Sequence, residues 1–204
     1  MTDSSNRILL NVGGGNASIG VPHYYEGWTH RRLDIDPATA PDYVCDARDM
    51  RELRMASIDA VYCSHNLEHY YRHDVPRVLQ GFLRVLKPDG FAEIRVPDVG
   101  MVMKLVVERG LDIEDVLYES AMGPITVRDV LYGYAPEIER SGTDYYAHKT
   151  GFTTKSLPKV LHASGFETVL CATGNLEVVA FAFKSTITDF HRTFLGIQSA
   201  PPGN

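Results

Sequence analysis

The stretch Ile8-Leu9-Leu10-Asn11-Val12-Gly13-Gly14-Gly15-Asn16 decides the fold of this chain. Its first five residues have the length and apolar character of a buried strand, and three glycines follow without a spacer. Glycine lets the backbone turn sharply and leaves room for a ligand beside the main chain. In an open α/β sheet, ligands bind at the carboxyl ends of the strands. Gly13, Gly14 and Gly15 are therefore predicted to bind a cofactor, although an ordinary turn would use the same residues.

Outward from this stretch, short apolar runs alternate with amphipathic helical patterns. Helices are predicted at residues 75–86 and 153–165, where apolar residues recur on one face. Such alternation is typical of an α/β fold with a mostly parallel sheet and helices on both faces. The tight turn at Gly174-Asn175 makes the last strand antiparallel. The predicted strands are residues 8–12, 32–35, 43–45, 58–64, 91–96, 166–172 and 177–183.

The length of 204 residues suits one domain with a sizeable core. Residues 1–184 are expected to form this domain. Within it, residues from about 98 to 150 do not follow the alternation and carry many tyrosines among proline and glycine breaks, so we predict an inserted lid there. Residues 185–204 are expected to be a tail, either a short helix or a loose end.

Acidic side chains follow the second and third predicted strands. Asp34 ends the second strand about twenty residues after the glycines, where a carboxylate can accept hydrogen bonds from both hydroxyls of a ribose. An alternative interpretation is that Asp34 or Asp36 only caps the turn at Pro37. Asp46 and Ala47 end the third strand, where a carboxylate and backbone groups can hold an adenine ring.

Two further motifs relate the sequence to a known protein family. Residues 58–69 read IDAVYCSHNLEH and residues 84–90 read RVLKPDG. Together with the glycines and the acids, they resemble the class I S-adenosylmethionine-dependent methyltransferases, in the group whose fourth strand runs into His-x-Leu-Glu-His. The resemblance covers most of residues 8 to 97. It implies a Rossmann-like three-layer sandwich with a seven-stranded sheet in the order 3-2-1-4-5-7-6, and S-adenosyl-L-methionine as the methyl donor.

The resemblance also implies roles for individual residues. Asn11 stands where the family has an acid, and its amide oxygen can still accept a hydrogen bond from an ammonium group. The family's third glycine falls on Ala17, and its Lys-Pro-Gly-Gly turn has Asp89 in the third place. By this resemblance the donor site consists of Asn11, Gly13, Gly14, Gly15, Asp34, Ile35, Asp46, Ala47, Ser64 and His65.

Histidines are the candidate bases for removing a proton from the methyl acceptor, because an imidazole titrates near neutral pH. His65, His69 and His148 are considered, and His65 and His148 are predicted to be catalytic; each can equally be a hydrogen-bonded structural residue. Residues 65–69 also fit the H-x-x-E-H pattern of zinc peptidases. That pattern needs a surrounding helix and a third ligand, whereas His65 directly follows a strand, so no metal site is predicted.

Composition limits the partners. The net charge of −6 offers no broad basic surface, so nucleic acid is not expected as a partner. Three widely spaced cysteines and the lack of an apolar leader or span predict a reduced, cytoplasmic protein without membrane contact. The lid favours an enclosed acceptor pocket for a small molecule or a glycan, and homo-oligomerisation stays open. Two alternatives remain, an NAD(P)-dependent oxidoreductase and a non-catalytic protein that binds an adenosyl nucleoside.

Overall fold

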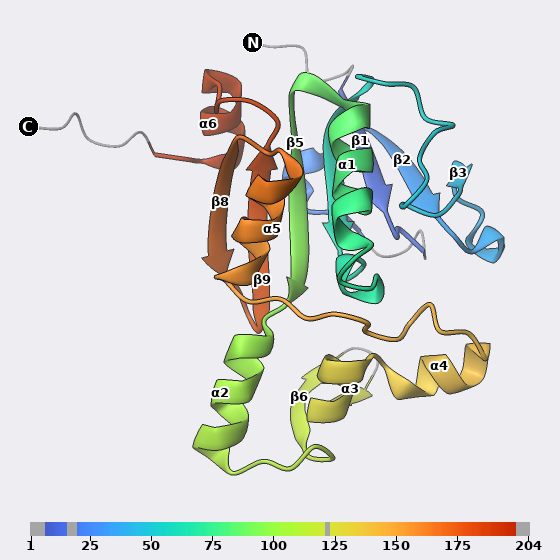
Figure 1. Cartoon of the computed structure of the whole chain (residues 1–204), viewed down its shortest axis with the longest axis vertical. Helices are drawn as coiled ribbons and strands as arrows, with labels where there is room; N and C mark the ends of the chain where they lie inside the picture. The colour runs from blue at the N-terminus through green and yellow to red at the C-terminus, as the bar shows by residue number, and fades with distance from the viewer. Residues whose placement is uncertain (1–6, 16–19, 121–122, 199–204) are drawn as a thin grey trace, which may run out of the picture.

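A seven-stranded sheet forms the centre of the molecule in the computed structural model, which describes residues 7–15, 20–120 and 123–198 (Figure 1). The strands lie in the order β3-β2-β1-β4-β5-β9-β8, with β1 to β5 parallel and β9 antiparallel to both of its neighbours. The predicted fold class is thereby confirmed. The strands are β1 (Ile8–Val12), β2 (Thr29–Asp34), β3 (Tyr43–Val44), β4 (Ile58–Ser64), β5 (Leu86–Pro97), β8 (Thr168–Thr173) and β9 (Glu177–Phe183).

One face of the sheet is covered by α1 (Val75–Val85) and α5 (Ser156–Ser164). The apolar residues of α1 recur every three or four positions, and those at Val78, Leu79 and Phe82 are fully buried against the sheet. The helix ends at Val85, one residue before the predicted end at residue 86. The chain then enters β5 directly at Leu86, five residues before the predicted start of that strand.

The opposite face is covered by aromatic side chains. Phe91 and Phe183 of the sheet pack under Tyr25, Trp28 and the helix α6 (Asp189–Leu195). Residues 185–204 were predicted to be a short helix or a loose end, and the described part contains a helix that packs on the sheet. A capping box at Thr188 starts α6, and the ring of its Phe194 lies 5.1 Å from that of Trp28.

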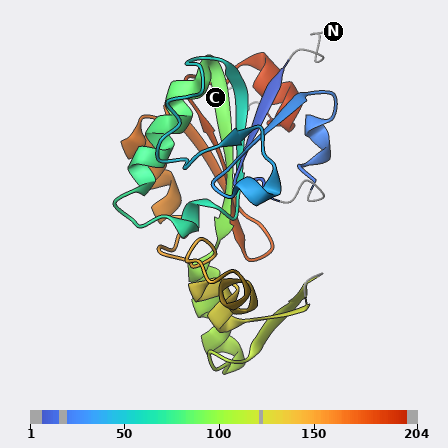
Figure 2. The ribbon, with the colours of Figure 1, turned by 90° about the vertical axis from the view of Figure 1, so that its right-hand side faces the viewer.

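The insertion forms a small unit at the carboxyl ends of the parallel strands, which Figure 2 shows projecting beyond the sheet. It has a core of its own around Val102, Leu117, Val127 and Val130. The two-stranded sheet β6–β7 within it was not predicted from the sequence. We call this unit the lid; its elements are α2 (Val99–Arg109), β6 (Val116–Ser120), β7 (Gly123–Thr126), α3 (Val127–Tyr132) and α4 (Ala135–Ser141).

A segment that we call the strap, residues 145–152, returns the chain from the lid to the sheet. It crosses η4 (Leu67–His69), a single 3-10 turn after β4. The Glu68 carbonyl accepts hydrogen bonds from the strap amides of Lys149 (2.8 Å) and Thr150 (3.2 Å). Within the described ranges, no helix is long and apolar enough to cross a bilayer.

Candidate functional site

The glycine turn after β1 is packed against the end of β4. Gly13 has a φ of +69°, a conformation that glycine adopts without strain. Its N–H donates to the Leu33 carbonyl at 2.8 Å, and a Cβ at this position would lie 2.3 Å from Nδ2 of Asn66. At Gly15, by contrast, the nearest atom to such a Cβ is Oδ2 of Asp34 at 3.6 Å. Among the described residues, the turn therefore excludes a side chain at Gly13, whereas a Cβ at Gly15 would make only ordinary van der Waals contacts.

Asp34 joins the glycine turn to the end of β2. Its Oδ2 accepts from the Gly15 N–H at 2.9 Å, and its Oδ1 accepts from the Asp36 N–H at 2.9 Å. Asp36, in turn, caps the short helix η3 (Pro37–Thr39) by accepting from the Ala38 N–H at 2.8 Å. The capping role considered for the two acids thus belongs mainly to Asp36. Each oxygen of Asp34 keeps a lone pair, so this carboxylate still suits a ribose diol.

Asp46 lies beside a pocket of about 190 Å³ that Ile35 and Asn66 also line. Burial favours the neutral form of this carboxyl, but hydrogen bonds from Arg48 outweigh burial and lower the pKa of Asp46. The guanidinium is shared, since Arg48 Nη2 lies 2.6 Å from Asp46 and its Nη1 lies 3.1 Å from Asp74. Ala47, the next residue, is buried and presents no side chain to the pocket lining. One side of the pocket wall is therefore formed by charged groups, which the two ion pairs of Arg48 hold in position.

The residues around this pocket fit an adenosyl group. The glycine turn after β1, the carboxylate of Asp34 after β2 and the small pocket beside Asp46 after β3 follow one another along the strand ends. A volume of about 190 Å³ is below the roughly 300–1,000 Å³ of a complete ligand pocket, which suits a base rather than a whole nucleoside donor. Ala17 lies outside the described residues. Asn11 lines a separate hollow with His30 and Arg32, so its expected contact with the donor stays a prediction.

A larger pocket of about 530 Å³ lies between the carboxyl edge of the sheet and the lid. The lid contributes Tyr118 and Tyr134 to its wall, the strap contributes Tyr146 and His148, and the segment after β4 contributes His65. The two predicted catalytic histidines therefore line the same pocket from different elements. The remaining lining combines apolar residues with polar ones such as Asp129 and Glu177, as expected for a site that must also orient its ligand.

His65 begins the turn after Ser64 in a strained backbone conformation, with a φ of +48°. Its Nε2 lies 2.6 Å from Glu177 and its Nδ1 lies 3.5 Å from Glu68. Burial alone would lower the pKa of His65, but the hydrogen bond to Glu177 and the negative charge of Glu68 raise it to about 10. The ring is therefore charged at neutral pH and has no lone pair to accept a proton. This finding does not fit the predicted role of His65 as a base.

His148 is neutral instead. Its Nδ1 donates to the Val130 carbonyl at 2.9 Å, which leaves the lone pair of the neutral ring on Nε2. Burial lowers the pKa of His148. Nε2 lies 4.0 Å from Oε1 of Glu68, a carboxylate that is only 1% exposed. His148 thus has the protonation state that the predicted role requires.

The zinc-peptidase pattern at residues 65–69 does not form a pair of histidines on one helix. The segment is a single 3-10 turn, and the His65 ring is bonded to Glu177. Glu68 and His69 instead approach His148 from the strap. Glu68 and Glu177 were both missed as site residues. The motif itself offered a signal for Glu68, whereas Glu177 reaches the site through the pairing of β9 with β5, which no local pattern reveals.

Residues 11–94 match the model of a family described as a methyltransferase domain. The chain carries a methyltransferase domain. This match spans the glycine turn, Asp34, Asp46 and the segment through His69, so the methyltransferase family seen in the sequence is confirmed. The lid and the strap lie outside the matched residues. A comparison with curated protein sequences gives no match.

Solved structures share the fold of this methyltransferase. A SAM-dependent methyltransferase from Archaeoglobus fulgidus has a TM-score of 0.53 at 14% identity, with 89% of this chain and 88% of that chain covered. One from Methanosarcina mazei has a TM-score of 0.54 at 16% identity, with 88% and 91% covered. The 1,6-didemethyltoxoflavin-N1-methyltransferase of Burkholderia thailandensis, solved with 1,6-didemethyltoxoflavin and S-adenosylhomocysteine, has a TM-score of 0.55 at 16% identity, with 88% and 71% covered.

Proposed function

We propose that this methyltransferase transfers a methyl group from S-adenosylmethionine to a hydroxyl or amino group of a small molecule or a sugar held under the lid. The observation that carries the proposal is the adjacency of two pockets along the strand ends, both lined by His69. One pocket fits the adenosyl part of the donor, and the other is large enough for a small acceptor.

The shape and charge of the lid pocket support a small acceptor. Tyrosine rings on its wall suit a flat or sugar-like molecule, because they combine an apolar face with a polar tip. The net charge of −6 does not favour nucleic acid. The three cysteines are unpaired, which fits the reducing cytoplasm that we propose as the location.

Different residues of the chain would bind the donor and take the acceptor proton. Asp34 would accept hydrogen bonds from the ribose, and the amides of Gly13 to Gly15 would border the methionine part. When bound, S-adenosylmethionine supplies a sulfonium methyl group, and the electron pair of the broken C–S bond stays on sulfur as the acceptor lone pair bonds to carbon. His148 lines the acceptor pocket, and the lone pair on its Nε2 would take the acceptor proton.

Binding and turnover test the proposal separately. Calorimetric titration should show binding of S-adenosylmethionine and S-adenosylhomocysteine, whereas clear binding of NAD without either would overturn the proposal. Screening hydroxyl and amino acceptors for release of S-adenosylhomocysteine should then identify a substrate. On that substrate, His148→Ala should lower kcat by about 10²- to 10⁴-fold, the usual contribution of a positioned base. His162→Ala on α5 is a matched control that should keep full activity, because its ring bonds to the Phe166 carbonyl instead.

A further inference from the structure

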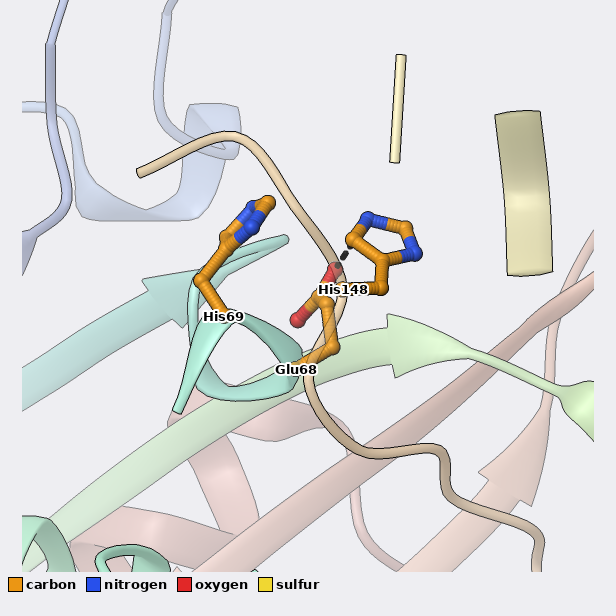
Figure 3. A group of neighbouring side chains, drawn as sticks. All are labelled: Glu68, His69 and His148. Atoms are coloured by element: carbon orange, nitrogen blue, oxygen red, sulfur yellow. Dashed lines mark ion pairs between the residues drawn. The ribbon is translucent and has the colours of Figure 1, made fainter. Parts of the chain in front are cut away.

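A group of three potential metal ligands includes two histidines that line the lid pocket. Glu68 and His69 come from η4, and His148 comes from the strap. One ligand atom from each lies within 4.8 Å of the others. Figure 3 shows the Glu68 carboxylate with an imidazole ring on either side of it. We propose that these three residues bind a divalent transition-metal cation of the zinc type.

The buried carboxylate is the first argument for a cation. Glu68 is 1% exposed, and within the described part of the chain neither of its side-chain oxygens has a hydrogen-bond partner. A buried polar group without a partner is costly, and a buried carboxylate is more costly still. Its nearest charged neighbour, His65, lies 3.5 Å away and makes its short contact with Glu177 instead. A cation between Glu68 and the two other ligands would balance this charge.

His69 gives a second, independent argument. Its Nδ1 faces the Ala147 carbonyl at 3.1 Å, and its Nε2 faces the His65 carbonyl at 3.2 Å. A neutral imidazole carries only one N–H, so one of its nitrogens would then point a lone pair at a carbonyl oxygen. That lone pair lacks a hydrogen donor, and a rotation of the ring away from the carbonyl would make it available to a metal ion. His148 already has its Nδ1 hydrogen-bonded to a carbonyl, as metal-binding histidines usually do, with Nε2 left for the metal.

The chemical types of the three ligands indicate which metal ion would bind. Two imidazoles and one carboxylate suit zinc and its neighbours, whereas magnesium and calcium prefer oxygen ligands. Zinc–ligand distances of about 2.1 Å place two ligands at most about 4.2 Å apart, so the cluster has to close by several tenths of an ångström. Three protein ligands leave a coordination position toward the pocket, as in catalytic rather than structural zinc sites.

This inference extends the proposed function. The catalytic role given to the cation depends on that function, whereas the metal site itself does not. With the cation bound, the Nε2 lone pair of His148 holds the metal and no longer accepts the proton. An acceptor hydroxyl bound to the open position would have its pKa lowered by the cation, and would release its proton to water before its oxygen lone pair bonds to the methyl carbon. The C–S electron pair again remains on sulfur, so no oxidant or reductant is needed.

Zinc titration of the full chain, after treatment with a chelator, tests the site without any substrate. We expect one zinc ion per chain in calorimetry, much weaker binding of magnesium, and a rise in Tm on adding zinc. His148→Ala and Glu68→Gln should each weaken zinc binding by more than about 100-fold, because losing even an outer-shell partner costs about 10- to 100-fold. His73→Ala, at an exposed histidine outside the cluster, is the control and should bind zinc like the parent protein.

Three outcomes would overturn the inference: no zinc binding, equal binding by His148→Ala and the parent, or loss of binding in His73→Ala. A variant that fails to fold is replaced by His69→Gln, whose zinc-dependent rise in Tm should also vanish. Titration of the same samples with S-adenosylmethionine keeps the two proposals apart. Donor binding without zinc binding would remove only the metal site, and zinc binding without donor binding would remove the methyltransferase proposal.

Discussion

The Gly15 N–H donates a 2.9 Å hydrogen bond to Oδ2 of Asp34, so the glycine turn and the acid at the end of β2 form one structural unit. The two residues lie at the ends of neighbouring parallel strands, and the bond fixes the edge along which a nucleoside would lie. Substitution of the acid should therefore disturb donor binding more than the stability of the sheet.

Asp34→Ala should weaken binding of S-adenosylmethionine and of S-adenosylhomocysteine. Loss of a charge-assisted hydrogen bond costs about 1.5–3 kcal/mol, which is roughly 10- to 100-fold in Kd. Calorimetric titration of both ligands measures the effect. Asp36→Ala is the matched control, because Asp36 caps η3 through the Ala38 N–H and should change the affinity little. Equal affinities of Asp34→Ala and the parent would remove Asp34 from the donor site.

Gly133→Ala should displace the strap. Gly133 has a φ of +98°, and a Cβ there would lie 2.1 Å from the Tyr146 carbonyl oxygen, so the backbone of the strap has to move. Hydrogen exchange should show faster exchange of the Lys149 amide, which donates to Glu68. Gly142→Ala is the control, because its φ of +64° is also positive but nothing lies within 4 Å of the added Cβ. Equal protection of Lys149 in both variants would contradict the role given to the strap.

The sequence predicts the features that depend on residues close together in the chain, and it misses those that depend on long-range packing. The turn at Gly13 and the buried face of α1 depend on neighbours a few residues apart, and both were predicted. Helix α6 was harder, because it spans seven residues and depends on packing of Phe194 against Trp28 rather than on a repeating pattern. Similarly, the two strands of the lid are too short for alternation to identify them.

The site residues also differ in whether local sequence or long-range contacts determine their environment. Asp34 and Asp46 could be named because they follow strands directly, whereas the environment of each histidine depends on long-range contacts. His65 and His148 look equivalent in the sequence. Their difference comes from Glu177, which β9 brings to His65, and from the Val130 carbonyl, which the lid brings to His148. No local pattern contains either contact.

Glu93→Gln should destabilise the whole domain. Glu93 is fully buried on the aromatic face and accepts hydrogen bonds from the hydroxyls of Tyr24 and Tyr25 and from Arg95. Arg95 is 27% exposed and also lies 3.7 Å from Glu177, so the loss should be about 1–3 kcal/mol, below the value for a fully buried ion pair. Urea unfolding measures the loss. Glu167→Gln, at an exposed glutamate, should change the unfolding free energy by less than about 0.5 kcal/mol, and a similar loss in both variants would contradict this account.

Asp129 should make the stability of the lid depend on pH. Burial favours the neutral carboxyl, but hydrogen bonds from Thr126 and Ala135 outweigh it and lower the pKa of Asp129. A folded-state pKa below the unfolded value of about 3.9 gives stability that is fully present above that pH and is lost as the pH falls through the folded pKa.

Asp129→Ala removes the capping box of α3 and should therefore lower stability by about 0.5–2 kcal/mol at pH 7. The difference between variant and parent should begin to shrink as the pH falls below about 4, where the unfolded carboxyl takes up a proton, and should be smallest below the lowered pKa of the folded carboxyl. Urea unfolding or hydrogen exchange of the lid at pH 7 and pH 3 measures both values. Glu139→Ala, at an exposed position of α4, is the control. A difference for Asp129→Ala that stays constant across this range would show that the cap does not act through its charge.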